Sequence, residues 1–232
     1  MKEESSLSEI LLKRLDETTA SDLRKLNAVL FPVKYAVSRR AFHSQSLFTQ
    51  PVKMLQLFLL MLFSYSHHSQ ESFYRDSAAA GTCTSLAYAR GGGGGGGGDD
   101  DENAFNELAG AIAVRLEKHP KLPNKARMYI MTLGVYAPHR ARGVGSRLLM
   151  NSLNEASEDE NIVDAYLHVQ TNNEEAIKFY CDPSGKFAFE KGEVIEKYYK
   201  RIEPDSAVVL RLEMKKWKRK EVEKARYMEY HA

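Results

Sequence analysis

The sequence is poor in cysteine, in long apolar runs and in net charge, and each shortage argues against a class of protein. Its two cysteines, Cys83 and Cys181, cannot form a disulfide framework, and their separation fits no zinc-binding motif. We therefore expect no bound metal and a reduced compartment, the cytoplasm, with a nuclear pool left open.

The most apolar stretch, residues 54–63, has about half of the roughly 20 residues that a membrane-spanning helix needs. Residues 1–16 lack the basic start and apolar centre of a secretory signal, so we expect no leader. The formal net charge of +2 is too small to indicate a nucleic-acid-binding surface. Only residues 215–232 are distinctly basic, and we expect a solvated tail there rather than a ribosomal RNA contact.

A chain of 232 residues with 43% apolar content can bury one substantial core, so we expect one domain, residues 1–214. Alternating strand-like and helix-like segments predict an α/β domain with helices on both faces of the sheet. The patterns predict helices at 21–30, 72–88, 145–158 and 173–181, and strands at 108–117, 127–135, 165–170, 187–191 and 207–214.

The most informative segment is a strand-like run at 128–135, followed by a glycine turn at 140–146 and a helix start. Such a turn aligns free backbone N–H groups with the positive end of a helix dipole, an arrangement that binds pyrophosphate. The Walker pattern and the third glycine of the dinucleotide fingerprint are both absent. A tight structural connection is the alternative, but the Arg-x-x-Gly-x-Gly spacing resembles the acetyl-CoA loop of the GCN5-related N-acetyltransferases (GNAT).

Five further segments occur in the order found in that superfamily, at 31–35, 129–134, 166–170, 173–180 and 198–204. Together they resemble the subfamily of N-terminal acetyltransferases that supplies the catalytic subunit of NatE complexes, and the similarity covers 23–35 and roughly 72–210. The resemblance implies the GNAT fold, a central mixed β-sheet with helices on both faces and a splayed parallel strand pair holding acetyl-CoA. It also implies acetyl transfer from acetyl-CoA to a peptide α-amine.

Insertions interrupt this similarity. Residues 36–71 are either a lineage-specific loop or unspliced intron sequence, and we expect a loop displaced from the pocket, because closure entropy grows only logarithmically with length. Residues 90–103 hold a glycine tract and an acidic cluster, which is typical of a flexible linker. Residues 182–185 lengthen a later turn. Ala188 replaces a glycine of the family, which strains the backbone if positive φ is required there.

For the cosubstrate, the resemblance implies three groups of contacts. The backbone of Leu133 and Val135 holds the pantetheine arm at a strand bulge that aims an N–H group at the thioester oxygen. Asn173 and Tyr180 form a second contact segment, for which helix capping and core packing are the alternatives. The pyrophosphate residues are Arg140, Arg142, Gly143, Val144, Gly145 and Ser146.

For catalysis, the resemblance implies Tyr129 and His168, although a core histidine is the ordinary interpretation of His168. A peptide α-amine has a pKa of about 7.7 to 8.0, so a modest base suffices for its direct attack on the thioester. His168 accepts the proton directly or through a water, and Tyr129, a poor base, orients that water. Strand alternation predicts two shared faces, one with Tyr129, Met131 and Leu133, and one with Tyr166, His168 and Gln170.

The resemblance also implies an apolar and aromatic peptide pocket, suited to a retained initiator Met followed by an apolar residue. N-terminal acetylation is favoured by the pocket segments. The alternatives are acetylation of lysine or small amines, and a catalytically weak accessory subunit of a ribosome-associated NatA/NatE complex. The implied partners are nascent or free protein N-termini and the NatA auxiliary and catalytic subunits, without nucleic acid. The pocket residues are Phe31, Pro32, Val33, Tyr35, Met131, Tyr198, Tyr199 and Ile202.

Overall fold

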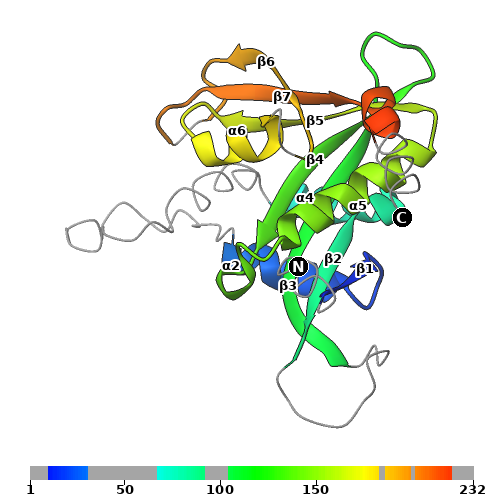
Figure 1. The fold of residues 1–232 in the computed structure, drawn as a ribbon, viewed down its shortest axis with the longest axis vertical. Helices are drawn as coiled ribbons and strands as arrows, with labels where there is room; N and C mark the ends of the chain where they lie inside the picture. The colour runs from blue at the N-terminus through cyan, green and yellow to red at the C-terminus, as the bar shows by residue number, and fades with distance from the viewer. Residues whose placement is uncertain (1–9, 31–66, 92–103, 183–185, 200–201, 221–232) are drawn as a thin grey trace, which may run out of the picture.

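Seven β-strands form one sheet in the computed structural model, which describes residues 10–30, 67–91, 104–182, 186–199 and 202–220 (Figure 1). The strand order is β1-β2-β3-β4-β5-β7-β6, with β4 and β5 parallel and the other neighbours antiparallel. This mixed sheet confirms the expected α/β class. The strands are β1 (Ile10–Arg14), β2 (Ser85–Arg90), β3 (Phe105–Lys118), β4 (Ala126–Val135), β5 (Ile162–Gln170), β6 (Glu190–Ile195) and β7 (Ala207–Glu213).

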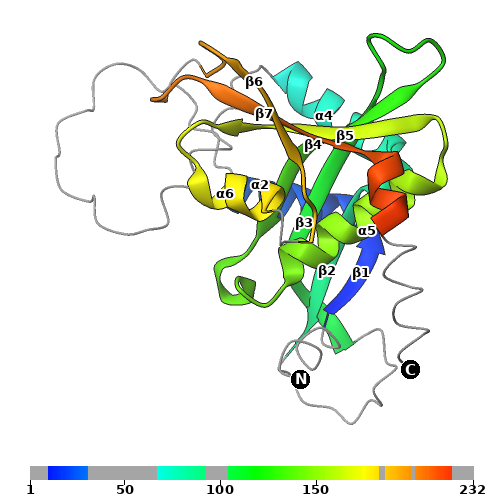
Figure 2. The same cartoon turned by 45° about the horizontal axis from the view of Figure 1, so that its top comes forward.

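Helices cover both faces of the sheet, which Figure 2 shows from a second direction. On one face, α5 (Val144–Glu158) buries Leu148 and Leu153 in a core with Ile112 of β3. On the other face, α2 (Ala20–Leu30) and α4 (His67–Ala79) pack Leu23 and Phe73 around Ala111. None of the described helices combines the length and apolarity that crossing a bilayer requires. Further helical segments are α6 (Glu174–Cys181), η1 (Gly81–Cys83) and η3 (Ala137–His139).

The parallel strands β4 and β5 separate partway along their length. Their pairing runs from Ala126 opposite Ile162 to Tyr129 opposite Tyr166. Beyond that point, no described residues of the two strands pair through their backbones. β4 continues along β3, whereas β5 continues along β7. The splayed pair is therefore confirmed, and the separation begins at Tyr129.

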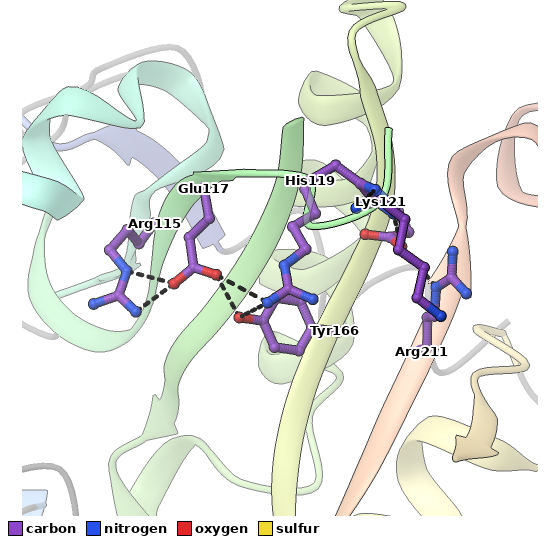
Figure 3. Close-up of polar contacts among 8 residues, drawn as sticks. Arg115, Glu117, His119, Lys121, Tyr166 and Arg211 are labelled. Carbon is purple, nitrogen blue, oxygen red and sulfur yellow. Dashed lines mark hydrogen bonds and ion pairs between the residues drawn. The ribbon is translucent and has the colours of Figure 1, made fainter. Parts of the chain in front are cut away.

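A buried carboxylate links β5 to β7 and to the residue that follows β3, near the end where β4 and β5 are paired. Asp164 of β5 accepts a hydrogen bond from Arg211 Nε of β7 at 2.6 Å, and His119 Nε2, after β3, lies 3.6 Å from the same oxygen (Figure 3). The other ring nitrogen of His119 accepts backbone N–H bonds from Lys121 and Leu122, so its proton is on Nε2 and faces Asp164. Three strands are thus joined at the end away from the splay.

A bulge in β4 corrects one prediction about which residues share a face. Val114 pairs with Ile130 and Ala113 with Thr132, so Met131 is the extra residue. The expected bulge at Leu133 and Val135 is therefore placed too late in the chain. An extra residue inverts the alternation beyond it. Tyr129 and Met131 face the α2 and α4 core, whereas Leu133 packs against the α5 core, so the prediction of one shared face was wrong for Leu133.

The expected helix at 72–88 was wrong in its second half. α4 ends at Ala79, Gly81 adopts a φ of +59°, and Ser85–Arg90 forms β2 between β1 and β3. Five of the six residues of β2 are buried. A short strand buried on both faces has no alternating pattern, so periodicity does not distinguish it from a helix. β1 was not predicted either.

The expected insertions lie largely outside the described residues. Of residues 36–71, only 67–71 are described, and they belong to α4. Of residues 90–103, only Arg90 and Gly91 are described. The other predicted helices and the strands at 108–117, 127–135, 165–170 and 207–214 are confirmed with small shifts at their ends.

The strand expected at 187–191 begins later, at Glu190, because the backbone at Ala188 is not extended. Ala188 has a φ of +54°, between the buried rings of Phe187 and Phe189. The positive φ that a glycine of the family would adopt easily is thus required at this position, and alanine there is strained.

Ala188→Gly should raise the free energy of unfolding by about 0.5–1 kcal/mol, because relief of the left-handed strain exceeds the entropy lost by a more flexible unfolded chain. Urea denaturation followed by circular dichroism measures the change. Ala156→Gly, inside helix α5, is the matched control and should destabilise the protein. Destabilisation by both variants would show that Ala188 is not strained.

The packed domain extends beyond the boundary expected at residue 214. Residues 214–220 are helical, and Trp217 is 1% exposed. Its ring stacks on Phe187 with centroids 6.1 Å apart, and its Nε1 donates to Asn154 Oδ1 at 2.9 Å. The predicted solvated tail therefore begins too early, because the many lysines of this segment conceal one buried aromatic ring.

Candidate active site

Four aromatic rings gather where β4 and β5 separate. Tyr129 of β4 stacks on Tyr166 of β5, with centroids 4.9 Å apart. The His168 ring lies edge-on to both, at 5.6 Å and 5.8 Å, and stacks on Tyr198 at 4.4 Å. The structure therefore brings together both predicted catalytic residues and one residue of the predicted peptide pocket.

His168 is held in its neutral form. Burial, assisted by the positive charge of Arg127, lowers the pKa of the imidazole to about 4, while Glu117 opposes the shift. Its Nδ1 atom is buried and has no hydrogen-bond partner among the described residues. A neutral ring with an unpartnered nitrogen can accept a proton, which an imidazolium cannot. The low pKa makes it a weaker base than its residue type suggests.

Tyr129 and Tyr198 stay protonated. Burial and the neighbouring Tyr198 raise the pKa of Tyr129 well above its ordinary value, and burial also raises the pKa of Tyr198. The side-chain contact between the two hydroxyl groups raises the pKa of Tyr129 and lowers that of Tyr198. A phenol in this state orients a neighbouring group and does not remove its proton.

A polar network lies beside the rings, and the sequence interpretation missed it (Figure 3). Glu117 of β3 accepts hydrogen bonds from Tyr166 Oη at 2.5 Å and from Arg115 Nε at 2.9 Å. Arg127 Nη2 donates to Tyr166 Oη at 3.1 Å and lies 3.4 Å from Glu117 Oε2. Arg115 lies opposite Tyr129 in the β3–β4 register, which the sequence alone did not reveal.

The glycine turn opens helix α5 without a side-chain cap. Gly143 is the N-cap residue, with a φ of +76° and a ψ of 0°, so glycine suits this turn. A Cβ atom at Gly145 would meet only Val135 Cγ2, at 3.7 Å, so the space above the first turn is open. Uncapped N–H groups at an accessible helix start fit an anionic pyrophosphate. Val144 itself is buried in the core.

The two arginines of this loop are anchored differently. Arg140 Nε donates to Val135 O at 3.1 Å and ties the loop to the end of β4. Arg142 Nη1 lies 3.4 Å from Nδ1 of the buried His139, whose Nε2 lies 3.1 Å from Glu107 Oε1. An arginine only donates, so His139 accepts at Nδ1 and presents its proton to Glu107. The sequence interpretation missed His139 and Glu107, which orient Arg142.

A cavity of about 390 Å³ adjoins the start of α5 and is lined by Ser146, Lys178, Phe179 and Phe187, among others. Its place beside the glycine turn fits the nucleotide half of acetyl-CoA. Asn173 caps α6 through a hydrogen bond from Ala176 N at 3.1 Å. Tyr180 is buried against Phe189, with ring centroids 5.4 Å apart. Both residues thus make the structural contacts named as alternatives, and their cosubstrate contacts stay predictions.

The predicted peptide pocket is described only in part. Phe31, Pro32, Val33 and Tyr35 lie outside the described residues. Met131 is buried beside Tyr129, and Ile202 is half-buried. Tyr199 is 2% exposed, and its hydroxyl has no hydrogen-bond partner in the described part of the chain, whereas Tyr198 stacks on the His168 ring. Within the described ranges, no group of three histidine, cysteine or acidic residues could hold a metal ion.

Comparison with known proteins finds the acetyltransferase family that the sequence resembles. The acetyltransferase (GNAT) family profile matches residues 56–182, more than half of the chain. N-alpha-acetyltransferase 50 from Danio rerio is 38% identical over 160 residues, 68% of this chain and 80% of the relative. The probable N-acetyltransferase san from Drosophila melanogaster is 36% identical, over 68% of this chain and 73% of the relative.

A solved structure agrees. Arabidopsis thaliana Naa50, in complex with the bisubstrate analogue CoA-Ac-MVNAL, superposes with a TM-score of 0.58 at 33% identity, covering 88% of this chain and 98% of that one. The chain therefore belongs to the GNAT acetyltransferase family and, within it, to the N-alpha-acetyltransferase 50 group of acetyl-CoA-dependent N-acetyltransferases.

Proposed function

We propose that the protein acetylates the α-amine of peptides that retain an initiator Met followed by an apolar residue. The observation that carries the proposal is the placement of Tyr129, His168 and Tyr198 together where β4 and β5 separate. The bisubstrate analogue bound by Arabidopsis Naa50 joins CoA through an acetyl group to a peptide that begins Met-Val. Buried Met131 packs in one cluster with Tyr129 and supplies apolar surface beside these rings, and Ile202 is half-buried.

In this mechanism the amine attacks the acetyl group directly. A C–N bond forms, the C–S bond breaks, and one proton must leave the amine nitrogen while one reaches the departing sulfur. Acetyl-CoA supplies an activated acyl carbon when it is bound. About a tenth of a peptide α-amine is already neutral at pH 7, whereas lysine is almost wholly protonated.

His168 accepts the amine proton directly or through a water. Its pKa of about 4 makes removal of a proton from a free ammonium unfavourable, so the amine must enter neutral. The nitrogen becomes strongly acidic only as the C–N bond forms, and the neutral imidazole then receives the proton. Tyr129, kept protonated by burial and by Tyr198, orients the water or the amine.

The loop geometry supports the following cosubstrate contacts. The start of α5 at Gly143, Gly145 and Ser146 presents backbone N–H groups to the pyrophosphate. Arg142, oriented by His139, adds a charge-assisted contact. Leu133 and Val135, just beyond the bulge at Met131, extend along the open side of β4 and hold the pantetheine arm.

The test compares two peptides with acetyl-CoA and the purified protein. One begins Met-Leu with a free α-amine, and the other has a blocked N-terminus and an internal lysine. CoA release only with the free N-terminus is the expected result. Release with the blocked peptide would favour lysine acetylation, and tight acetyl-CoA binding without release would favour an accessory subunit of a larger complex.

A further inference from the structure

One carboxylate, that of Glu117, binds groups that lie beside Tyr129 and beside Tyr166. Glu117 lies on β3, and its two oxygens bind three groups (Figure 3). Oε1 accepts from the Arg115 guanidinium, and Oε2 accepts from Tyr166 Oη at 2.5 Å, with Arg127 Nη2 at 3.4 Å. Burial disfavours the charged form of Glu117, but these bonds outweigh that cost and lower its pKa. Glu117 therefore stays ionised at neutral pH.

The ring of Tyr166 transmits this anchoring to the catalytic pair. It stacks on Tyr129 with an interplanar angle of 29° and touches the edge of the His168 ring. Tyr129 and Tyr166 are the last paired residues of β4 and β5, so beyond them no ladder restrains the two strands against each other. Side-chain contacts must then hold the rings in register, and the Tyr166 hydroxyl fixes one end of the stack on Glu117.

Glu117 also restrains two cations near the reacting groups. The Arg115 guanidinium lies 5.3 Å from the Tyr129 ring centroid, and that of Arg127 lies 4.0 Å from the Tyr166 centroid. A second acid near Arg115 is Asp76 of α4, at 3.9 Å, too distant for a hydrogen bond. Removal of Glu117 would leave two poorly compensated positive charges beside rings that they attract.

We infer that Glu117 is a positioning residue for acetyl transfer. Through the Tyr166 hydroxyl and the two arginines, it holds the Tyr129 hydroxyl and the His168 ring in one mutual arrangement. The inference rests on the proposed catalytic roles of Tyr129 and His168. Glu117 itself touches neither ring that we assign to proton transfer.

The test removes the hydrogen bond between Tyr166 and Glu117 by changing either partner. Tyr166→Phe deletes one hydroxyl and keeps the stacked ring, and Glu117→Gln keeps the shape and deletes the charge. Each variant should lower kcat about tenfold, because small misplacements of catalytic groups are costly, and should leave the KM for acetyl-CoA unchanged. The double variant should lose little more than the single ones, because both act through one contact.

Glu190→Gln is the matched control. Glu190 lies on the edge strand β6, two strands from Tyr166, and pairs with Lys216, so its replacement should leave kcat unchanged. Unchanged kcat in Tyr166→Phe, or losses that multiply in the double variant, would overturn the inference. If Glu117→Gln does not fold, Tyr166→Phe decides the question alone. A fall in thermal stability with kcat intact would make Glu117 purely structural.

His168→Ala in the same assay separates this inference from the proposed function. Turnover lost in His168→Ala but kept in Tyr166→Phe and Glu117→Gln would overturn only the role of Glu117. Turnover kept in His168→Ala would overturn the proposed proton transfer and this inference together.

Discussion

Replacing His168 with alanine should lower kcat by about 10²- to 10⁴-fold, the range that positioned acid–base groups supply, and should leave acetyl-CoA affinity unchanged. Its ring lies among Tyr129, Tyr166 and Tyr198, and not at the glycine turn that fits the pyrophosphate. The neutral imidazole keeps one buried nitrogen without a described partner, which is available to a substrate proton or a water. Single-turnover acetylation and calorimetric titration with acetyl-CoA measure the two quantities separately.

Two further variants control this experiment. His168→Gln keeps a polar side chain of similar size beside Tyr198, so a loss shared with His168→Ala reports proton transfer and not a cavity. Tyr129→Phe should reduce kcat less, because a phenol with a raised pKa orients and does not act as base. Lost acetyl-CoA affinity in His168→Ala would instead assign the ring to the cosubstrate, and unchanged kcat would exclude it from proton transfer.

The elements that form the site were predictable because the sequence marks them strongly. β4 and α5 have clear apolar patterns and are joined by a glycine turn. Asn173 caps α6 as its residue type favours. The splay of β4 and β5 came from the family resemblance and not from periodicity, because no local pattern states where two paired strands part.

The features that the sequence did not reveal depend on register. One extra residue at Met131 turned Leu133 to the opposite face, and a bulge leaves no composition signal in an apolar run. Glu117, Arg115 and Arg127 look like ordinary strand charges until the antiparallel register places them beside Tyr129 and Tyr166. Charges on a strand are usually solvated, so only tertiary pairing separates this network from a polar face.

Replacing Gly143 with glutamate should weaken acetyl-CoA binding by at least about 100-fold, because phosphate contacts at a helix start are charge-assisted and a carboxylate would repel the anion. Gly143 precedes the uncapped first turn of α5, so the new side chain would compete for the N–H groups that the pyrophosphate needs. A side chain at a φ of +76° also costs about 1–2 kcal/mol of stability. Calorimetry and the thermal shift produced by acetyl-CoA report the affinity.

The controls separate charge from backbone strain. Gly143→Ala carries the strain without the carboxylate, so its affinity should lie between those of the wild type and Gly143→Glu. Gly81→Ala places the same residue type at a φ of +59° in a turn where a Cβ atom meets nothing within 4 Å, and it should lower stability without changing affinity. Equal losses in Gly143→Ala and Gly143→Glu would assign the effect to the turn conformation. Unchanged affinity in Gly143→Glu would show that the pyrophosphate does not bind at the start of α5.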